Sequence, residues 1–167
     1  MERWRAIDAA HGDDARAMLR VCCGSTRWIE RMLAERPFGS RERALRLARD
    51  TWFSLEPSDW REAFAHHPRI GDLEALRERF PDAGSLSARE QAGVTDAAAS
   101  TLGALLEGNR AYEARFGYIF IVCASGRTAA EMLDILRARL RNDPSEEIGI
   151  AAGEHADICE RRLLAQV

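Results

Sequence analysis

Apolar residues recur at helical spacing along almost the whole of this 167-residue chain, and neither an internal repeat nor a low-complexity tract interrupts them. One helix should end near Pro37, and another should begin after Ser40. Their apolar faces carry Trp28, Ile29, Met32 and Leu33, and then Ala44, Leu45, Leu47, Ala48, Trp52 and Phe53. A chain of this length with 46% hydrophobic residues can build one hydrophobic core of ordinary size, whereas two separate domains would each have a small core. We therefore predict an all-α, single compact multi-helix domain over residues 1–167.

The helical pattern lapses in residues 116–124, an uninterrupted apolar run rich in aromatic and β-branched side chains. Such a run is typical of buried extended backbone, so we predict a short buried extended segment near 118–124. Buried N–H and C=O groups must find hydrogen-bond partners. Two interpretations stay open: a polar ligand supplies those partners, or the run is a short buried strand or the start of the next helix.

Charged residues of both signs are interleaved, with 24 basic and 27 acidic residues and a net charge of −3, which does not indicate a nucleic-acid-binding surface. Every basic residue is an arginine, so lysine Schiff-base chemistry is excluded and an anionic substrate would meet planar guanidinium groups. The N-terminal residues lack the apolar run of a secretion signal, and no stretch approaches the roughly 20 apolar residues that cross a bilayer. We therefore expect a cytoplasmic protein without a membrane partner.

The four cysteines are Cys22, Cys23, Cys123 and Cys159, which are too sparse for a disulfide scaffold and form no CxxC pair. We expect them to be reduced thiols. Cys22 and Cys23 are adjacent, and we expect no pair of Cys or His with the gap of about two to four residues that separates paired zinc ligands. The sequence therefore predicts no metal ion.

His67 directly precedes Pro68 at the end of a predicted helix that starts at Pro57. Proline disfavours the α conformation for the residue before it, so His67 should leave the helix with its ring aimed by the backbone. An imidazole titrates near neutral pH, which makes a rigidly presented histidine a candidate for proton transfer. The alternative is a histidine that merely ends a helix on or near the surface.

Two further patterns invite a structural or a functional interpretation. Ser87 and Glu90 have the spacing of a helix capping box, which by itself accounts for both residues at about 1 kcal/mol. Arg162 shares a face of the last helix with mostly apolar residues, and a buried arginine needs an anion. The residues of that face are Ile148, Ala151, Ala152, His155, Ile158, Cys159, Arg162 and Leu163.

The order and spacing of several short motifs resemble the 2-oxo-4-hydroxy-4-carboxy-5-ureidoimidazoline (OHCU) decarboxylase family over nearly the whole chain. The motifs are Cys22-Cys23-Gly24-Ser25 with Arg27-Trp28, Arg36-Pro37-Phe38, His67-Pro68-Arg69-Ile70-Gly71-Asp72, Ser87-Ala88-Arg89-Glu90-Gln91, Asn109 with Tyr112, Arg115-Phe116-Gly117-Tyr118, Phe120-Ile121-Val122-Cys123-Ala124 and Arg162-Leu163. The resemblance implies an all-helical enzyme without cofactor or metal that converts OHCU into S-allantoin and carbon dioxide in urate degradation. It also implies a homodimer and a functional link to urate oxidase and hydroxyisourate hydrolase.

Carried over residue by residue, the resemblance makes His67 the catalytic histidine and Glu90 its carboxylate partner. It implies that the substrate-binding residues are Pro68, Ser87, Ala88, Arg89, Gln91, Phe120, Ile121, Val122, Cys123, Ala124 and Arg162. The backbone of the run Phe120 to Ala124 would bind the ring and ureido group. Arg162, chosen over Arg161, would hold a substrate oxygen or carboxylate. Ile119 replaces a proline common in eukaryotic relatives, which affects the local backbone shape rather than its binding role.

Two other hypotheses are consistent with parts of the sequence. A non-catalytic helical binding or regulatory module could use its buried arginine and histidine only to satisfy each other. A thiol-dependent enzyme of the carboxymuconolactone type would need a CxxC-like pair beside a histidine, and this chain offers only the adjacent Cys22 and Cys23.

Overall fold

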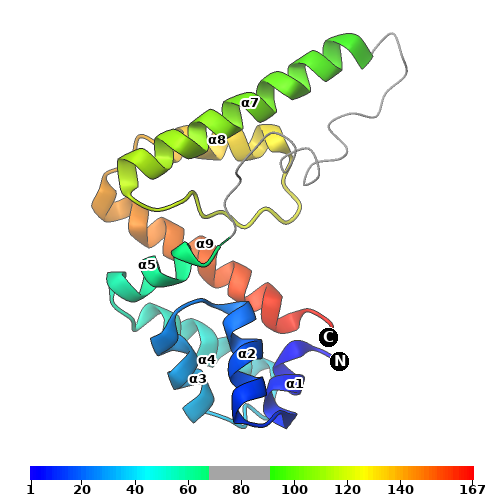
Figure 1. Cartoon of the computed structure of the whole chain (residues 1–167), viewed down its shortest axis with the longest axis vertical. Coiled ribbons are helices and arrows are strands. Elements are labelled where there is room, and N and C mark those ends of the chain that lie inside the picture. Colours follow the sequence, from blue (N-terminus) through cyan, green and yellow to red (C-terminus); the bar gives the residue numbers. More distant parts are fainter. Residues whose placement is uncertain (68–90) are drawn as a thin grey trace. The chain divides into compact units, whose positions relative to one another are not determined.

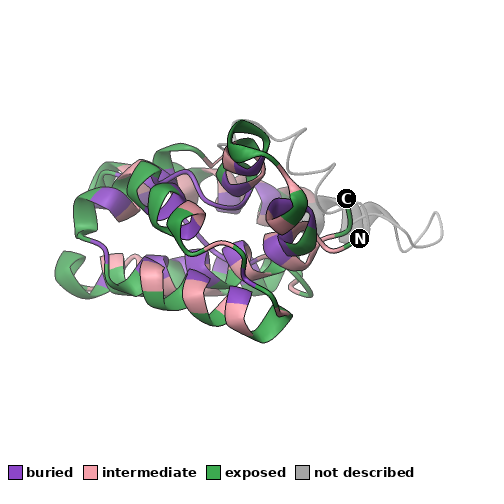
Figure 2. Ribbon diagram, turned by 90° about the horizontal axis from the view of Figure 1, so that it is seen from below, coloured by how far each residue is buried: buried purple, intermediate pink, exposed green. Residues whose placement is uncertain are grey.

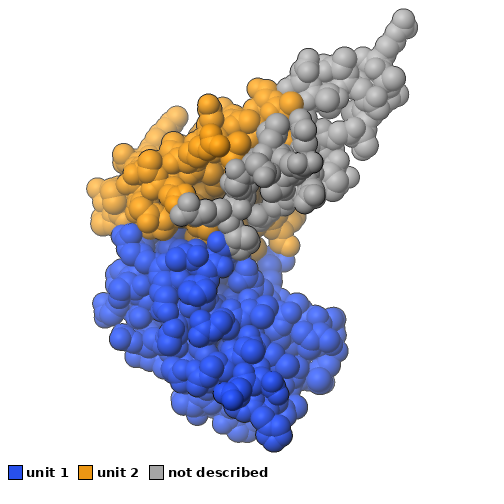
Figure 3. Space-filling model, viewed as in Figure 1, with its two compact units in different colours: residues 1–67, 148–167 blue, residues 68–147 orange. Residues whose placement is uncertain are grey.

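The computed structural model describes the backbone of residues 1–67 and 91–167, and the side chains of 1–67 and 99–167. The chain divides into two compact units, one of residues 1–67 with 148–167 and one of residues 68–147 (Figure 3). Within the described residues all regular elements are helices, apart from an isolated bridge between Glu2 and Gln166. The predicted all-α class is confirmed, and no described helix has the length and apolar character needed to span a membrane.

The first unit consists of five N-terminal helices and most of the last helix, which spans Pro144–Leu164 (α9) (Figure 1). The five helices are α1 (Arg3–Ala9), α2 (Gly12–Cys22), α3 (Thr26–Ala34), α4 (Arg41–Phe53) and α5 (Pro57–Ala65). Helix α3 packs against α2, α4 and α5, so it is the central helix of this group. The chain ends meet here, where the Arg3 amide donates to the Ala165 carbonyl over 2.9 Å.

Local sequence signals mark the starts of three of these helices, and those at Ser40 and Pro57 were predicted from the sequence. The Ser25 hydroxyl accepts from the Trp28 amide at the start of α3, and the Ser40 hydroxyl accepts from the Arg43 amide at the start of α4. A side-chain oxygen at this position satisfies one of the amides that a helix start leaves unpaired. Pro57 begins α5, where its missing N–H costs nothing.

Buried residues follow one face of each helix (Figure 2). In α3 and α4 these residues are Trp28, Ile29, Met32, Ala44, Ala48 and Trp52. The two buried tryptophans also form hydrogen bonds through their indole N–H groups. Trp28 donates to the Ala48 carbonyl over 3.0 Å, and Trp52 donates to the Ala152 carbonyl over 2.8 Å. One predicted core residue was wrong: Phe53 is 45% exposed, since it ends α4 and lies beneath the guanidinium of Arg49.

The second unit is built on the long helix α7 (Gln91–Phe116), which packs against α8 (Ala129–Arg139). Between them, residues 118–124 belong to neither helix nor strand. Phe120, Ile121, Val122 and Cys123 are all buried, so the predicted buried segment is present and is not the start of α8. Glycines with φ of 76° and 77°, Gly117 and Gly126, lie on either side of it, in the left-handed conformation that glycine adopts most readily.

Candidate functional site

His67 lies just after the end of α5, as the proline motif predicted. Helix α5 ends at Ala65, His66 is its C-cap with φ −84° and ψ −6°, and the His67 amide donates to the Phe64 carbonyl over 3.1 Å. The side chain is half-buried, whereas that of His66 is exposed. The two neighbouring histidines therefore occupy different environments, and only His67 turns toward the core of its unit.

The ring of His67 meets a second histidine that the sequence did not single out for chemistry. Its centroid lies 4.9 Å from that of His155, with the two planes at 73°, an edge-on contact. His155 is itself stacked on Trp52, with centroids 4.3 Å apart and planes at 21°, and contacts the Phe64 ring at 5.8 Å. These aromatic neighbours fix the plane of His155, which in turn forms one wall around the His67 ring.

His155 is fully buried, which disfavours its charged form. Burial is the main cause that holds the pKa of His155 well below its ordinary value, and the positive charges of His67 and Arg162 act in the same direction. His155 is therefore a neutral imidazole at neutral pH. The ring of His67 therefore has an uncharged aromatic neighbour at this contact.

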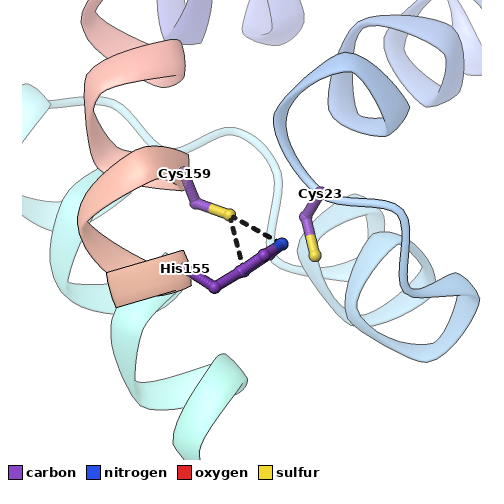
Figure 4. A group of neighbouring side chains, drawn as sticks. All are labelled: Cys23, His155 and Cys159. Atoms are coloured by element: carbon purple, nitrogen blue, oxygen red, sulfur yellow. Dashed lines mark hydrogen bonds between the residues drawn. The ribbon is translucent and has the colours of Figure 1, made fainter. Parts of the chain in front are cut away.

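Two cysteines complete the surroundings of His155 (Figure 4). The Cys159 thiol lies 3.3 Å from His155 Nδ1 and 3.2 Å from the Cys22 carbonyl oxygen. Ligand atoms of Cys23, His155 and Cys159 all lie within 4.8 Å of one another. All three residues are buried, so this Cys-His-Cys cluster is the arrangement among the described residues that could hold a metal ion.

The prediction that no Cys or His pair has the spacing of zinc ligands was wrong, because three residues separate His155 from Cys159. The available signal was the spacing of His155 and Cys159, four residues apart, which places both on one face of α9. The partner from the end of α2, Cys23, could not be found without the tertiary structure. Each of the four cysteines is buried, and none of these described residues forms a disulfide.

These thiols lack the features of an activated nucleophile. Burial raises the pKa of Cys22 to about 11 and raises the pKa of Cys159 well above its ordinary value. A reactive cysteine needs the opposite shift, because the thiolate is the attacking species. The geometry therefore gives no support to a thiol-dependent enzyme.

Arg162 is half-buried and Arg161 is exposed, consistent with the helical face used to choose between them. Arg162 Nη1 donates to the carbonyl oxygens of Val21 and Cys22, each over 3.2 Å. These carbonyls belong to the last turn of α2, where backbone acceptors lack helical partners. The sequence predicted a buried arginine that needs an anion. That prediction of burial was wrong, because the side chain of Arg162 is half-buried and carbonyl oxygens accept its hydrogen bonds.

In the second unit, Arg139 holds the segment that resemblance assigns to substrate binding. Arg139 Nη1 donates to the Ile121 carbonyl over 2.7 Å, and its guanidinium lies 4.8 Å from the centre of the Phe120 ring. The Arg127 amide donates to the Ala124 carbonyl over 3.2 Å. Protein groups therefore satisfy at least part of the backbone whose hydrogen-bond partners the sequence left open.

A buried polar cluster fixes Arg139 in turn. Arg139 Nη2 and Nε lie 2.6 Å and 2.7 Å from Glu147 Oε1, and the Tyr112 hydroxyl donates to the same oxygen. Asn142 donates to the other carboxylate oxygen over 2.7 Å. Neither the ion pair nor its role in holding residues 120–124 was evident from the sequence.

Pro68, Ser87, Ala88, Arg89 and Glu90 lie outside the described residues. Gln91 begins α7, and its side chain is also outside the description. The structure brings His67 and Arg162 to the surroundings of His155 in one unit, and it keeps Phe120 to Ala124 together in the other.

Comparison with known proteins gives a consistent set of relatives. A relative from Arabidopsis thaliana, the uric acid degradation bifunctional protein TTL, is 41% identical over 86% of this chain and 44% of its own length. The OHCU decarboxylase of Xenopus laevis is 33% identical over 58% of this chain and 55% of its own length. The chain thus spans about half the length of the curated relatives it matches.

Solved structures have the same fold. A crystal structure of OHCU decarboxylase in the presence of (S)-allantoin matches with a TM-score of 0.69 and 39% identity, over 86% of this chain and 92% of the other. An (S)-allantoin synthase matches with a TM-score of 0.68 over 96% of this chain and 52% of the other, but at 16% identity it supports the fold alone. The family model of OHCU decarboxylase matches residues 8–164, and the chain therefore belongs to the OHCU decarboxylase family.

Proposed function

We propose that this protein decarboxylates OHCU to S-allantoin without a cofactor, as a carboxy-lyase of urate degradation. The observation that carries the proposal is the placement of His67 directly after α5, half-buried and in edge contact with the neutral ring of His155. Family membership over residues 8–164 supports the choice of OHCU as substrate. A crystallised relative at 39% identity was studied with (S)-allantoin, the product of the proposed reaction.

The reaction needs one positioned proton donor. When the carboxylate leaves as carbon dioxide, the C–C bond breaks and its electron pair is delocalised into the ring. A proton must then reach the same carbon from one face to give a single enantiomer. His67 is our candidate for this donor, and a positioned general acid of this kind contributes about 10²–10⁴ in rate. Glu90 is proposed as its carboxylate partner.

The second group of residues would stabilise charge. We propose that peptide groups of Phe120 to Ala124 bind the amide-rich ring. The further proposed substrate-binding residues are Pro68, Ser87, Ala88, Arg89, Gln91 and Arg162. Arg139 supports this role because it holds the Ile121 carbonyl and packs on the Phe120 ring. Removing one fixed donor to a developing oxyanion typically costs on the order of 10²–10³ in rate.

The deciding experiment generates OHCU in the cuvette from urate with urate oxidase and hydroxyisourate hydrolase. Circular dichroism then follows S-allantoin formation with wild type, His67→Asn and His66→Asn. His66 is the matched control, because it is the same residue type one position earlier and its exposed ring contacts only the Glu62 carbonyl in the described hydrogen bonds. We expect rapid signal with wild type and His66→Asn, and near-background rates with His67→Asn.

Each outcome has a clear meaning. If both variants are as fast as wild type, the decarboxylase function stands and the assignment of His67 fails. If wild type itself does not accelerate the reaction, the chain is better described as a helical binding module. Racemic allantoin from active enzyme, under conditions where spontaneous decay is negligible, would contradict the proposed one-sided protonation.

We further propose a cytoplasmic homodimer that works alongside urate oxidase and hydroxyisourate hydrolase. The name of the Arabidopsis relative, a bifunctional protein of uric acid degradation, supports such a link. Light scattering coupled to gel filtration measures the oligomeric state directly, and a monomer at working concentration would exclude the homodimer.

A further inference from the structure

Three potential ligands converge beside the proposed catalytic histidine without any assigned role. Cys159 and His155 project from the same face of α9 (Figure 4). Cys23, the residue that follows α2, lies beside them. Their ligand atoms lie within 4.8 Å of one another, and Cys159 Sγ lies only 3.3 Å from His155 Nδ1. Pairs of ligands around a tetrahedral zinc ion are roughly 3.5–4 Å apart, given bonds of about 2.0–2.3 Å. The cluster is thus within about an ångström of that geometry.

We propose that Cys23, His155 and Cys159 form a buried binding site for a thiophilic divalent metal ion, with Zn²⁺ as the favoured occupant. Two sulfur ligands and one imidazole are the donor set that Zn²⁺ accepts, whereas Mg²⁺ and Ca²⁺ require oxygen ligands. The proposed decarboxylation itself uses no metal, although the ion would bind to His155, whose ring contacts that of His67.

The charges of the occupied site balance. Each cysteine binds as a thiolate after releasing its proton to the solvent buffer, while His155 binds as a neutral imidazole through one ring nitrogen. Two thiolates and one divalent ion give a neutral group. Neutrality matters because the three residues are at most 5% exposed, and an unbalanced charge there would be costly. A monovalent ion would leave one negative charge, which favours Zn²⁺ over Cu⁺.

Binding does not leave a neighbouring acceptor unsatisfied. The Cys159 thiol donates to the Cys22 carbonyl, and this hydrogen bond is lost once the proton leaves. The same carbonyl also accepts from Arg162 Nη1 over 3.2 Å, so it keeps a partner. That guanidinium also places a positive charge near the new thiolate, which favours the deprotonated form that metal binding requires.

The imidazole is already held in place. Stacking on Trp52 at 4.3 Å fixes its plane, and Trp52 is itself held because its indole N–H donates to the Ala152 carbonyl of α9. A ligand held this way loses little freedom on binding a metal. Cys23 is the ligand that joins a second element to this site, because it follows α2 whereas the other two ligands lie on α9.

The test adds Co²⁺, whose visible spectrum reports tetrahedral coordination with sulfur ligands, to the metal-free 167-residue chain. A phosphine reductant in the buffer keeps the thiols reduced. We expect wild type to bind one equivalent with intense visible and thiolate charge-transfer bands, and Zn²⁺ to displace it. Cys159→Ala and His155→Gln should lose these bands. Cys123→Ala is the matched control, since it removes a buried cysteine from the other unit, and Cys22→Ala tests whether the adjacent thiol replaces Cys23.

Wild-type protein carries the primary result, so a variant that fails to fold does not leave the question open. Absence of tetrahedral cobalt bands in folded wild type overturns the proposal, as does a spectrum lost in Cys123→Ala but kept in Cys159→Ala. A spectrum that survives Cys23→Ala but disappears in Cys22→Ala would overturn the assignment of Cys23. No substrate is present, so these outcomes are independent of whether the chain decarboxylates OHCU.

Discussion

The Arg139 guanidinium and the Glu147 carboxylate form a buried ion pair, with Nη2 2.6 Å from Oε1. Their side chains are 7% and 0% exposed, and the same carboxylate also accepts from Tyr112 and Asn142. Arg139 in turn holds the Ile121 carbonyl. The ion pair therefore connects the first turn of α9 to the segment proposed to bind substrate.

Glu147→Ala should destabilise the protein by about 3–5 kcal/mol, because it leaves the Arg139 charge buried without its partner. The matched control is Glu146→Ala, which removes the same side chain from the preceding, exposed position and should change stability by about 0.5 kcal/mol or less. Urea unfolding followed by circular dichroism measures both. Equal losses of unfolding free energy in the two variants would contradict the structural role of the buried ion pair.

These two glutamates also show where sequence reasoning stops. The helix start at Pro144 has local signals in the sequence, namely the proline itself and acidic residues in the first turn. Nothing local separates Glu146 from Glu147. Only the packing of Arg139 from the preceding helix and of Tyr112, which is 35 residues away in the sequence, decides which carboxylate is buried.

The same division applies to the candidate site. The end of α5 before His67 and the burial of residues 120–123 followed from proline chemistry and apolar patterning. His155 was grouped correctly with the apolar face of α9, but its contact with His67 joins positions far apart in sequence. Arg162 was assigned an anion because its neighbours on that face are apolar, and the carbonyls at the end of α2 that satisfy it come from another helix.

Tyr112 predicts a loss of stability at alkaline pH. Burial is the main cause that raises the pKa of this phenol far above its ordinary value, and its hydrogen bond to Glu147 adds to the effect. The folded protein therefore keeps a proton that the unfolded chain loses above about pH 10. The contribution of the Tyr112 hydroxyl to the free energy of unfolding is fully present below that pH and is lost as the pH rises. Above about pH 10, the free energy of unfolding of wild type should therefore fall by about 1.4 kcal/mol per pH unit more than that of Tyr112→Phe.

Phenolate absorbance checks this prediction directly. Tyr112 and Tyr118 are the two tyrosines of the chain, so Tyr118→Phe leaves Tyr112 as the single source of the signal. In that variant the phenolate band should appear together with the loss of helical circular dichroism. A phenol that ionises near pH 10 while the helices persist would contradict the buried environment described here.

Two glycines of α7 give a paired test of packing. A Cβ added at Gly108 would lie 2.5 Å from Leu136 Cδ2 and 3.2 Å from its Cγ, and Leu136 is fully buried in α8. Gly108→Ala should therefore cost about 1–3 kcal/mol through overpacking, offset by at most about 1 kcal/mol of helix propensity. Gly103→Ala meets nothing within 4 Å and should stabilise the protein by about 0.4–1 kcal/mol. Thermal unfolding measures both changes in stability. A stabilised Gly108→Ala together with a destabilised Gly103→Ala would contradict the packing of α7 against α8.

Arg162 and Arg161 test whether an arginine can serve both the fold and the substrate. Arg162→Gln should lower stability by about 1–2 kcal/mol, because charge-assisted hydrogen bonds to the Val21 and Cys22 carbonyls are lost from a half-buried site. If Arg162 also binds a substrate oxygen, KM should rise by about 10- to 100-fold. Arg161→Gln changes an exposed side chain and should alter neither quantity.

Steady-state kinetics and urea unfolding of the same preparations separate the two roles. Reduced stability of Arg162→Gln with an unchanged KM would assign the guanidinium to the end of α2 alone, where helical carbonyls need donors. Arg162→Lys sharpens the test, because it retains the positive charge but loses the planar fork that reaches two carbonyl oxygens. Recovery of KM without recovery of stability in Arg162→Lys would show that the substrate responds to charge, while the α2 terminus requires the guanidinium geometry.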